Sequence, residues 1–142
     1  MTVQTILVAH DGSEDAARAL AWAVGLARQT GARLAVVHAW SPLDDLDRHH
    51  DRANFTELHD EALAELRDEW CRDAIATGVT VEARLVEDRP VPGIVRAARE
   101  VGADLVVCGT RGRGRVGRAV LGSVARELPE KSHLPVVTVP PA

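Results

Sequence analysis

Residues 5–31, TILVAHDGSEDAARALAWAVGLARQTG, indicate which kind of fold this chain adopts. Thr5 to Ala9 form a short and continuous apolar run, which is typical of a strand buried on both faces of a sheet. The turn HDGS follows this run, and Ser13 is a good N-cap for a helix. Apolar residues then recur at helical spacing until Gly31, where the helix is expected to end. This segment therefore predicts a buried strand, a tight turn and an amphipathic helix.

The same alternation of strand and helix continues along the chain. Apolar runs predict strands over residues 34–39, 79–86, 105–108 and 136–139, and amphipathic stretches predict helices over about 52–77, from Pro90 to Gly102 and from Ser123 onward. The run at 79–86 alternates in polarity, so we expect it at a sheet edge. Strands that alternate with helices connect by right-handed crossovers into a parallel sheet covered on both faces. We therefore expect the α/β class, as a single doubly wound three-layer domain spanning residues 1–142.

The predicted helix over residues 52–77 carries one apolar stripe at four-residue steps. The stripe consists of Leu58, Ala62, Leu66, Trp70 and Ala74. Core packing is also expected for Trp22 and Trp40, with the border of a ligand pocket as the alternative for Trp40. Pro129 falls within the helix that begins at Ser123, where a proline is expected to kink or shorten the helix.

The composition bounds the classes of function. With 46% hydrophobic residues among 142, the chain has enough apolar surface for one core. A net charge of −4 argues against a surface that grips nucleic acid. Cys71 and Cys108 form no C-x-x-C pair, and two free thiols suit a reducing cytoplasm. Because no apolar stretch approaches the roughly 18 residues of a membrane span, we expect a soluble cytoplasmic protein with no membrane partner.

A second informative segment, GTRGRGRVGRAVLGS at residues 109–123, follows the fourth predicted strand. Glycines let backbone N–H groups approach an anion without a Cβ in the way, and a helix that begins at Ser123 presents unpaired N–H groups there. Ligands of doubly wound sheets bind at such carboxyl ends of strands. The alternative is a loop that only connects strand and helix. We favour a phosphate site, because the segment is longer than the roughly 2–6 residues usual for such a connection.

The same segment concentrates arginines in a protein that is acidic as a whole. These are Arg111, Arg113, Arg115 and Arg118. A guanidinium group presents a planar fork suited to phosphate oxygens, and we expect one or two of these arginines to contact ligand. The chain has no G-x-x-x-x-G-K-[ST] motif and no G-x-G-x-x-G after its first strand, which excludes a P-loop and disfavours a dinucleotide fold.

Two motifs together resemble those of the universal stress protein family. The first strand ends in V-A-x-D-G-S, and the spacing G-x2-G-x9-G-[ST] is met by Gly109, Gly112, Gly122 and Ser123. The resemblance spans essentially the whole chain, and the spaced glycines are similar to those of the family's ATP-binding branch. It implies an adenine-nucleotide alpha-hydrolase-like fold with a five-stranded sheet ordered 3-2-1-4-5. It also implies ATP, together with Mg²⁺, as the ligand, and a homodimer joined through the last strand.

The resemblance further implies one set of nucleotide-binding residues, drawn from three strand ends and the glycine segment. The set is Ala9, His10, Asp11, Ala39, Cys108, Gly109, Gly112, Arg113, Gly122, Ser123 and Val124. Its alanines and its cysteine would border the adenine, and Asp11 would reach the ribose or a metal-bound phosphate. The first two glycines would cradle ribose and phosphate, while Gly122, Ser123 and Val124 would offer N–H groups and a hydroxyl to the phosphates.

Some of these residues have structural alternatives. Asp11 could close its turn as an Asx residue, although its place at a strand end favours ligand contact. His10 could act as a base, but a lone histidine in a turn is more often structural. Ser13 is expected to be a helix cap rather than a ligand contact. One polar cluster could bind a metal or, as is usual for exposed loops, nothing specific: Asp47, His49, His50 and Asp51.

Three functions are compatible with these residues. The leading hypothesis is an ATP-binding regulator in the stress response, a homodimer in which nucleotide occupancy orders the glycine segment. The second is an enzyme, at most a slow ATPase or a nucleotidyl- or phosphotransferase. Only His10 and Asp11 lie near the expected phosphates and the segment has no lysine, so we expect no catalytic residues. The third is an interaction module whose arginines bind an acidic partner or RNA, which the acidic composition disfavours.

Overall fold

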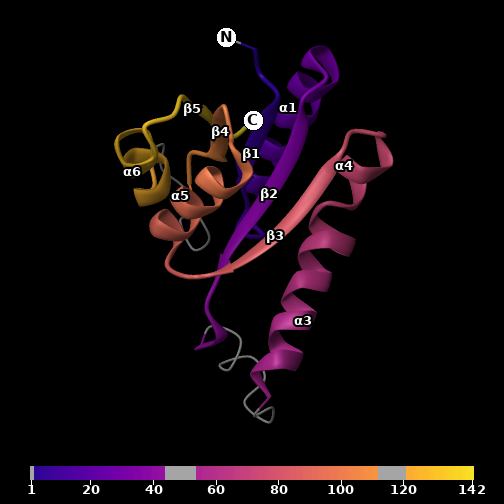
Figure 1. The fold of residues 1–142 in the computed structure, drawn as a ribbon, viewed down its shortest axis with the longest axis vertical. Helices are drawn as coiled ribbons and strands as arrows, with labels where there is room; N and C mark the ends of the chain where they lie inside the picture. Colours follow the sequence, from indigo (N-terminus) through magenta and orange to yellow (C-terminus); the bar gives the residue numbers. More distant parts are fainter. Residues whose placement is uncertain (1, 44–53, 112–120) are drawn as a thin grey trace.

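Parallel strands form one sheet in the order β3-β2-β1-β4-β5 (Figure 1). The strands are β1 (Thr5–Ala9), β2 (Arg33–Trp40), β3 (Val81–Glu87), β4 (Leu105–Gly109) and β5 (Val136–Val139). The structure is a computed structural model that describes residues 2–43, 54–111 and 121–142. The α/β class and the strand order are confirmed, and the alternating strand β3 lies at an edge of the sheet, as its pattern predicts.

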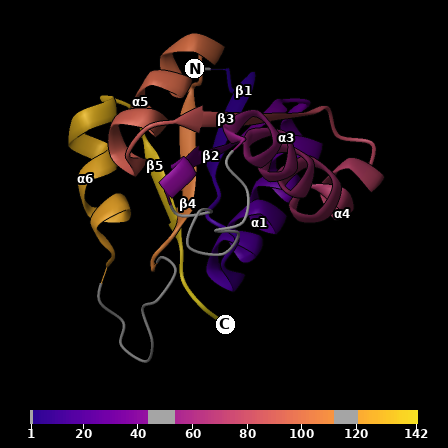
Figure 2. The same cartoon turned by 90° about the horizontal axis from the view of Figure 1, so that it is seen from below.

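Helices cover both faces of this sheet (Figure 2). The helices are α1 (Glu14–Thr30), α3 (Phe55–Glu65), the π-helix η1 (Leu66–Trp70), α4 (Arg72–Ala76), α5 (Pro90–Val101) and α6 (Ser123–Ser132). The layer with α1, α3, η1 and α4 packs on one face, whereas α5 and α6 pack on the other. No helix within the described ranges is long and apolar enough to span a lipid bilayer.

The central strand β1 shows why its sequence is apolar without interruption. Ile6 and Val8 pack in the core beneath α1, while Leu7 and Ala9 pack in the core beneath α5 and α6. Every residue of the strand is buried. Burying a side chain such as Leu or Ile stabilises the fold by roughly 1.5–3 kcal/mol, so both layers are held to this strand.

The first helix begins and ends where its capping residues predict. The Oγ of Ser13 accepts a hydrogen bond from the N–H of Ala16 at 3.1 Å. At the other end, Gly31 adopts a left-handed conformation with φ of 76°, which a side chain would disfavour. The predicted cap role of Ser13 is therefore confirmed.

The prediction of one uninterrupted helix over residues 52–77 is wrong in two respects. The helix begins at Phe55, capped by Asn54, and the π-helix η1 interrupts it before α4. An α-helix has about 3.6 residues per turn, so each four-residue step of the apolar stripe overshoots by about 40°. The wider π turn, closed by the hydrogen bond from the Cys71 N–H to the Leu66 carbonyl at 3.0 Å, takes up this drift. Leu66 and Ala74 consequently both stay buried.

Three further expectations about individual residues need correction. Trp22 is 43% exposed on the outer side of α1, because the stripe that faces the sheet is made of smaller residues such as Ala19 and Ala23. Trp40 is buried as expected, but it packs against α3 and does not line the cleft at the carboxyl ends of β1, β2 and β4. The helix α6 continues past Pro129 to Ser132. The proline removes a single backbone hydrogen bond, and the fully buried Leu128 beside it anchors the last turn in the core.

Candidate functional site

A cleft of about 210 Å³ lies at the carboxyl ends of β1, β2 and β4, between the first turns of α5 and α6. The chain crosses here from one half of the sheet to the other, because β1 connects to β2 on one side and has β4 on its other side. Such a switch point leaves a crevice beyond the strand ends, where ligands of this architecture bind.

The cleft brings together most of the residues expected to contact a nucleotide. Those that line it are Ala9, His10, Asp11, Ala39, Cys108, Gly109, Gly122, Ser123 and Val124. Gly112 and Arg113 lie outside the described residues, as do Asp47, His49, His50 and Asp51 of the possible metal cluster. Arg111, one of the arginines expected to contact ligand, also lines the cleft, whereas Val37, His38 and Ile94 line it without having been singled out for this site. These additions come from strand β2 and helix α5.

One side of the cleft is apolar and made of small side chains. Ala9 and Cys108 end the central strands, and Val37 and Ile94 extend this surface. Helix α5 approaches closely at Gly93, where an added Cβ would lie 3.4 Å from the Cβ of Ala39. Burial raises the pKa of the Cys108 thiol to about 11, so at neutral pH the thiol is uncharged and forms a wall, not a nucleophile. A flat apolar ring would fit against this side.

The opposite side of the cleft is the first turn of α6. The helix begins at Ser123, with Gly122 as its N-cap and no side chain bonded to the cap position. The N–H groups of Ser123, Val124 and Ala125 have no partner within the helix, because the first intrahelical bond is donated by Arg126 to the Gly122 carbonyl. All three residues line the cleft. This end of α6 therefore presents the partial positive charge of the helix dipole to whatever enters.

The N–H of Gly122 has a role other than the expected one. It donates to the carbonyl of Thr110 at 2.7 Å and so joins the two ends of the segment between β4 and α6. The expectation that this N–H faces phosphate does not hold in the structure, because the backbone already provides an acceptor. The spacing of the glycines in the sequence could not show this hydrogen bond, because it depends on how close Thr110 and Gly122 lie in the folded protein.

Asp11 and His10 both act in the turn after β1. The Oδ1 of Asp11 accepts a hydrogen bond from the Ser13 N–H at 3.0 Å, which is the Asx arrangement, and Asp11 also lines the cleft. The Nδ1 of His10 accepts from the Gly12 N–H at 3.0 Å. Neutral His10 therefore carries its proton on Nε2. The two interpretations of Asp11 are compatible, because one carboxylate has oxygen atoms for both roles.

The imidazole of His10 belongs to an aromatic group beside the cleft. Its ring is 5% exposed and stacks on Trp70 of the π-helix, with ring centroids 4.9 Å apart. His38 meets the same indole edge-on at 4.9 Å, and its Nδ1 donates to the His10 carbonyl over 2.9 Å. These contacts fix the end of β1 against η1, which supports the structural interpretation of His10.

The first residues after β4 are tied to the start of α1. A Cβ added to Gly109 would lie 3.0 Å from the Cβ of Asp15 and 3.1 Å from its carbonyl oxygen, so glycine is needed here for close packing. Arg111 pairs with the same residue, its Nε lying 2.9 Å from Oδ2 of Asp15. In the sequence Asp15 looked like an ordinary acidic residue of a first helical turn, and no local pattern links it to Arg111.

Comparison with known proteins agrees with this architecture. The sequence model of the universal stress protein family matches residues 2–140. A universal stress protein of Thermus aquaticus, encoded in the 3′ region of a QAH/OAS sulfhydrylase gene, is 40% identical over 147 residues, covering 96% of this chain and 98% of the relative.

Two solved structures share the fold and carry a bound nucleotide. A universal stress protein crystallised in complex with cAMP is 32% identical, with a TM-score of 0.73 and 98% of each chain covered. A universal stress protein of Archaeoglobus fulgidus in complex with dAMP is 28% identical, with a TM-score of 0.68, covering 97% of this chain and 98% of the other.

Proposed function

The chain belongs to the universal stress protein family, and we propose that it binds ATP in the cleft and acts as a nucleotide-dependent regulator of the stress response. The observation that carries this proposal is the uncapped first turn of α6, which faces a cleft with an apolar opposite side. An adenine ring needs the apolar side, and phosphates need the N–H groups. The cAMP and dAMP complexes of its relatives support an adenine nucleotide as the ligand class.

The lining residues suggest how ATP would lie. The base would rest against Ala9, Ala39 and Cys108, the ribose near Asp11, and the phosphates at the start of α6. Among the described residues there is no group of three side chains that could hold a metal ion. Mg²⁺ would therefore enter on the phosphates, with Asp11 as the carboxylate nearest to them.

The residues in the cleft favour binding over chemistry. No lysine is among the described residues that line it, so an activating ammonium group is missing from that part of the site. His10 already accepts a backbone hydrogen bond on Nδ1 and is stacked on Trp70. A slow ATPase or a nucleotidyl- or phosphotransferase remains the alternative. Turnover that is lost in Asp11→Asn while ATP still binds would favour that alternative.

Isothermal titration calorimetry with ATP, with and without Mg²⁺, tests the proposal. We expect binding by the wild type and its loss in Gly122→Glu, because a carboxylate at the start of α6 repels phosphate. Asp11→Ala should also weaken binding. The matched control is Gly25→Glu, which adds the same charge on α1 where a new Cβ meets nothing within 4 Å. Absence of ATP binding by the wild type, together with no nucleotide in mass spectra of the purified protein, would overturn the proposal.

Three accompanying expectations belong to the same proposal: the domain extent, the location and the dimer. We propose that residues 1–142 work as one nucleotide-binding domain in the cytoplasm and pair as a homodimer through β5. The strand lies at an open edge of the sheet and its residues Val136–Val139 are only half-buried. Sedimentation equilibrium should give the mass of two chains, and the mass of one chain would contradict the dimer.

An interaction module with an acidic partner or RNA is the third candidate. Of the arginines that would bind such a partner, Arg111 is paired with Asp15 at the cleft, and the other three arginines of the segment lie outside the described residues. Binding of such a partner that falls steeply with salt and ignores ATP would favour this function.

A further inference from the structure

We propose that Asp15 and Arg111 form a positioning pair that sets the preference of the cleft for nucleotides with a polyphosphate tail. Asp15 holds the guanidinium of Arg111 at the cleft, and Arg111 contacts the phosphates beyond the first. The inference rests on the proposed nucleotide binding, and it adds which residues distinguish ATP from AMP.

The contact between the two side chains is two-pronged and shielded from water. Nε of Arg111 lies 2.9 Å from Oδ2 of Asp15, and Nη2 lies 3.5 Å from Oδ1. The Asp15 side chain is 9% exposed and that of Arg111 is 19% exposed. The residues are 96 positions apart in the sequence, and Arg111 lines the cleft while Asp15 lies behind it on α1. A fork held at two points has a defined direction, which a solvated arginine lacks.

The backbone on either side of Arg111 is also held. Gly109 packs directly against Asp15, where a Cβ would come within 3.0 Å. The carbonyl of Thr110 accepts the N–H of Gly122 at 2.7 Å, which sets Arg111 next to the start of α6. Arg111 and the N–H groups of Ser123 and Val124, which have no partner within the helix, therefore border the same cleft. Both carry positive charge to the place where phosphates are proposed to lie.

The charges around Asp15 do not cancel. Arg18 also pairs with Oδ1 of Asp15, so one carboxylate is shared by two guanidinium groups and the cluster is cationic. Arg111 uses Nε and Nη2 for Asp15 among the residues that the structure describes. The N–H donors of its Nη1 remain for a ligand. A guanidinium edge of Arg111 at the cleft favours ATP over AMP, because ATP offers it more phosphate oxygens.

A purely structural ion pair is the alternative explanation. Asp15 and Arg18 are three residues apart in the first turn of α1, an arrangement that stabilises helices whatever the protein does. On that explanation, removing Arg111 changes the stability of the fold but leaves the ratio of ATP to AMP affinity as it was. The affinity ratio therefore separates the two explanations, whereas a melting temperature does not.

The experiment measures dissociation constants for ATP and AMP by calorimetry in wild type, Arg111→Ala, Asp15→Asn and the double variant. For Arg111→Ala we expect ATP to bind about tenfold more weakly, the usual effect of one charge-assisted hydrogen bond, and AMP to change less than about twofold. Asp15→Asn should lower the ATP to AMP preference in the same direction. The double variant should show little more loss than Arg111→Ala, because Asp15 acts through Arg111.

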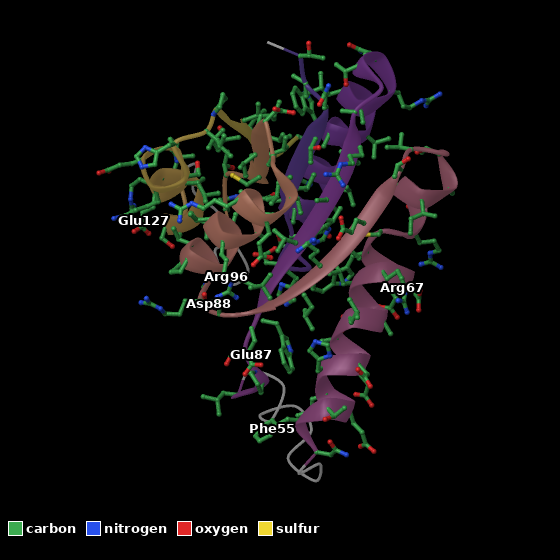
Figure 3. The ribbon with its side chains drawn as sticks, in the orientation of Figure 1. Phe55, Arg67, Glu87, Asp88, Arg96 and Glu127 are labelled. Atoms are coloured by element: carbon green, nitrogen blue, oxygen red, sulfur yellow. The ribbon has the colours of Figure 1, made fainter. Side chains whose placement is uncertain are left out.

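A second carboxylate shared by two arginines provides the matched control. Glu100 lies 3.0 Å from Arg84 and 3.9 Å from Arg96, at the end of α5 remote from the cleft. Figure 3 shows Arg96 beside Asp88, with which it also pairs at 3.1 Å. Glu100→Gln removes a similar shared carboxylate and should leave both dissociation constants unchanged.

Each outcome bears on one of the two claims. If Arg111→Ala and Asp15→Asn are folded by circular dichroism and keep the wild-type ratio of ATP to AMP affinity, the positioning pair is refuted and nucleotide binding stands. If the wild type binds neither nucleotide, the proposed function itself fails. Should Asp15→Asn unfold, Arg111→Lys serves instead, because it keeps the charge and loses the fork. An ATP preference between those of wild type and Arg111→Ala supports the pair, and an unchanged preference overturns it.

Discussion

Helices α1 and α6 both begin at the cleft, yet their first turns are completed in opposite ways. At α1, side chains accept the N–H groups of the turn: His10 bonds Gly12, Asp11 bonds Ser13, and Ser13 bonds Ala16. At α6 the N-cap is Gly122, and within the described residues no side-chain hydrogen bond caps the helix. The chain therefore satisfies the first helix end with its own side chains, and the second is the one at which we propose that a ligand binds.

On the proposed function, this difference separates a structural helix end from a binding one. A good N-cap residue stabilises a helix by roughly 0.5–2 kcal/mol relative to a poor one, and glycine loses only a small part of this. Glycine also has no side-chain oxygen that would compete with a ligand for the N–H groups. The fully buried Leu128 holds α6 to the sheet without help from a cap. The helix α6 therefore stays in place without a capping side chain, and on the proposed function the ligand takes the place of that side chain.

The largest effect is expected when α6 is made to resemble α1. In Gly122→Asp the new carboxylate can accept the N–H groups of the first turn, because the φ of −66° and ψ of 165° at this position suit a capping residue. ATP binding should weaken on the order of a hundredfold, because the carboxylate both occupies the N–H groups of the first turn and repels the phosphates. Calorimetry measures this loss, and urea unfolding should show equal or greater stability. Binding unchanged from wild type would contradict the role of α6.

The converse change makes α1 resemble α6. Ser13→Ala removes the oxygen that accepts the Ala16 N–H, so the free energy of unfolding should fall by about 1 kcal/mol. Urea unfolding measures this fall, while the ATP dissociation constant should stay within about twofold of wild type. A large loss of ATP affinity without a loss of stability would show that the start of α1 is part of the ligand site.

A smaller effect is expected from the hydroxyl at the start of α6. Ser123→Ala keeps the N–H groups and removes one donor from the cleft. ATP should bind about threefold more weakly, as for the loss of one neutral hydrogen bond. Calorimetry on this variant and on Ser132→Ala, at the far end of the same helix, gives the comparison. Equal effects in both variants would argue against a phosphate contact by Ser123.

The smallest effect concerns another pair of backbone donors satisfied by a side chain. Oδ2 of Asp104 accepts the N–H groups of Gln4 and Thr5 at 2.8 and 3.0 Å, and these bonds lower the pKa of Asp104 below its ordinary value of 3.8. The unfolded chain then binds the proton more tightly, so the contribution to stability is complete above the unfolded-state pKa. It is lost as pH falls through the folded-state pKa. Asp104→Asn should therefore flatten the acid limb of stability against pH, as measured by urea unfolding; an unaltered limb contradicts this.

Features set by neighbours in the chain were predictable. The buried strand β1, the cap at Ser13 and the helix stop at Gly31 follow from short patterns, and the structure confirms them. The four-residue stripe was correctly identified as a buried face. The π turn that keeps the stripe buried was missed, because apolar periodicity alone does not predict where a helix must widen to keep its apolar residues against the core. Trp22 was misplaced for the same reason, since the helix turns its small residues to the sheet.

The candidate site divides in the same way. Asp11, Gly122 and Ser123 were found through motifs whose spacing places them at strand and helix ends. Asp15 and the donor role of Gly122 toward Thr110 were missed. Each depends on a contact between residues that are not neighbours in the chain, and no local pattern pairs them.

By itself, the sequence determined the alternation of strands and helices, the ends of α1 and the start of a helix at Ser123 after the fourth strand. These depend on periodicity and capping, which act over a few residues. The tertiary structure decided which helix end stays open, which arginine meets Asp15, and which small side chains form the apolar side of the cleft. Such choices depend on the close packing of segments that only folding brings together.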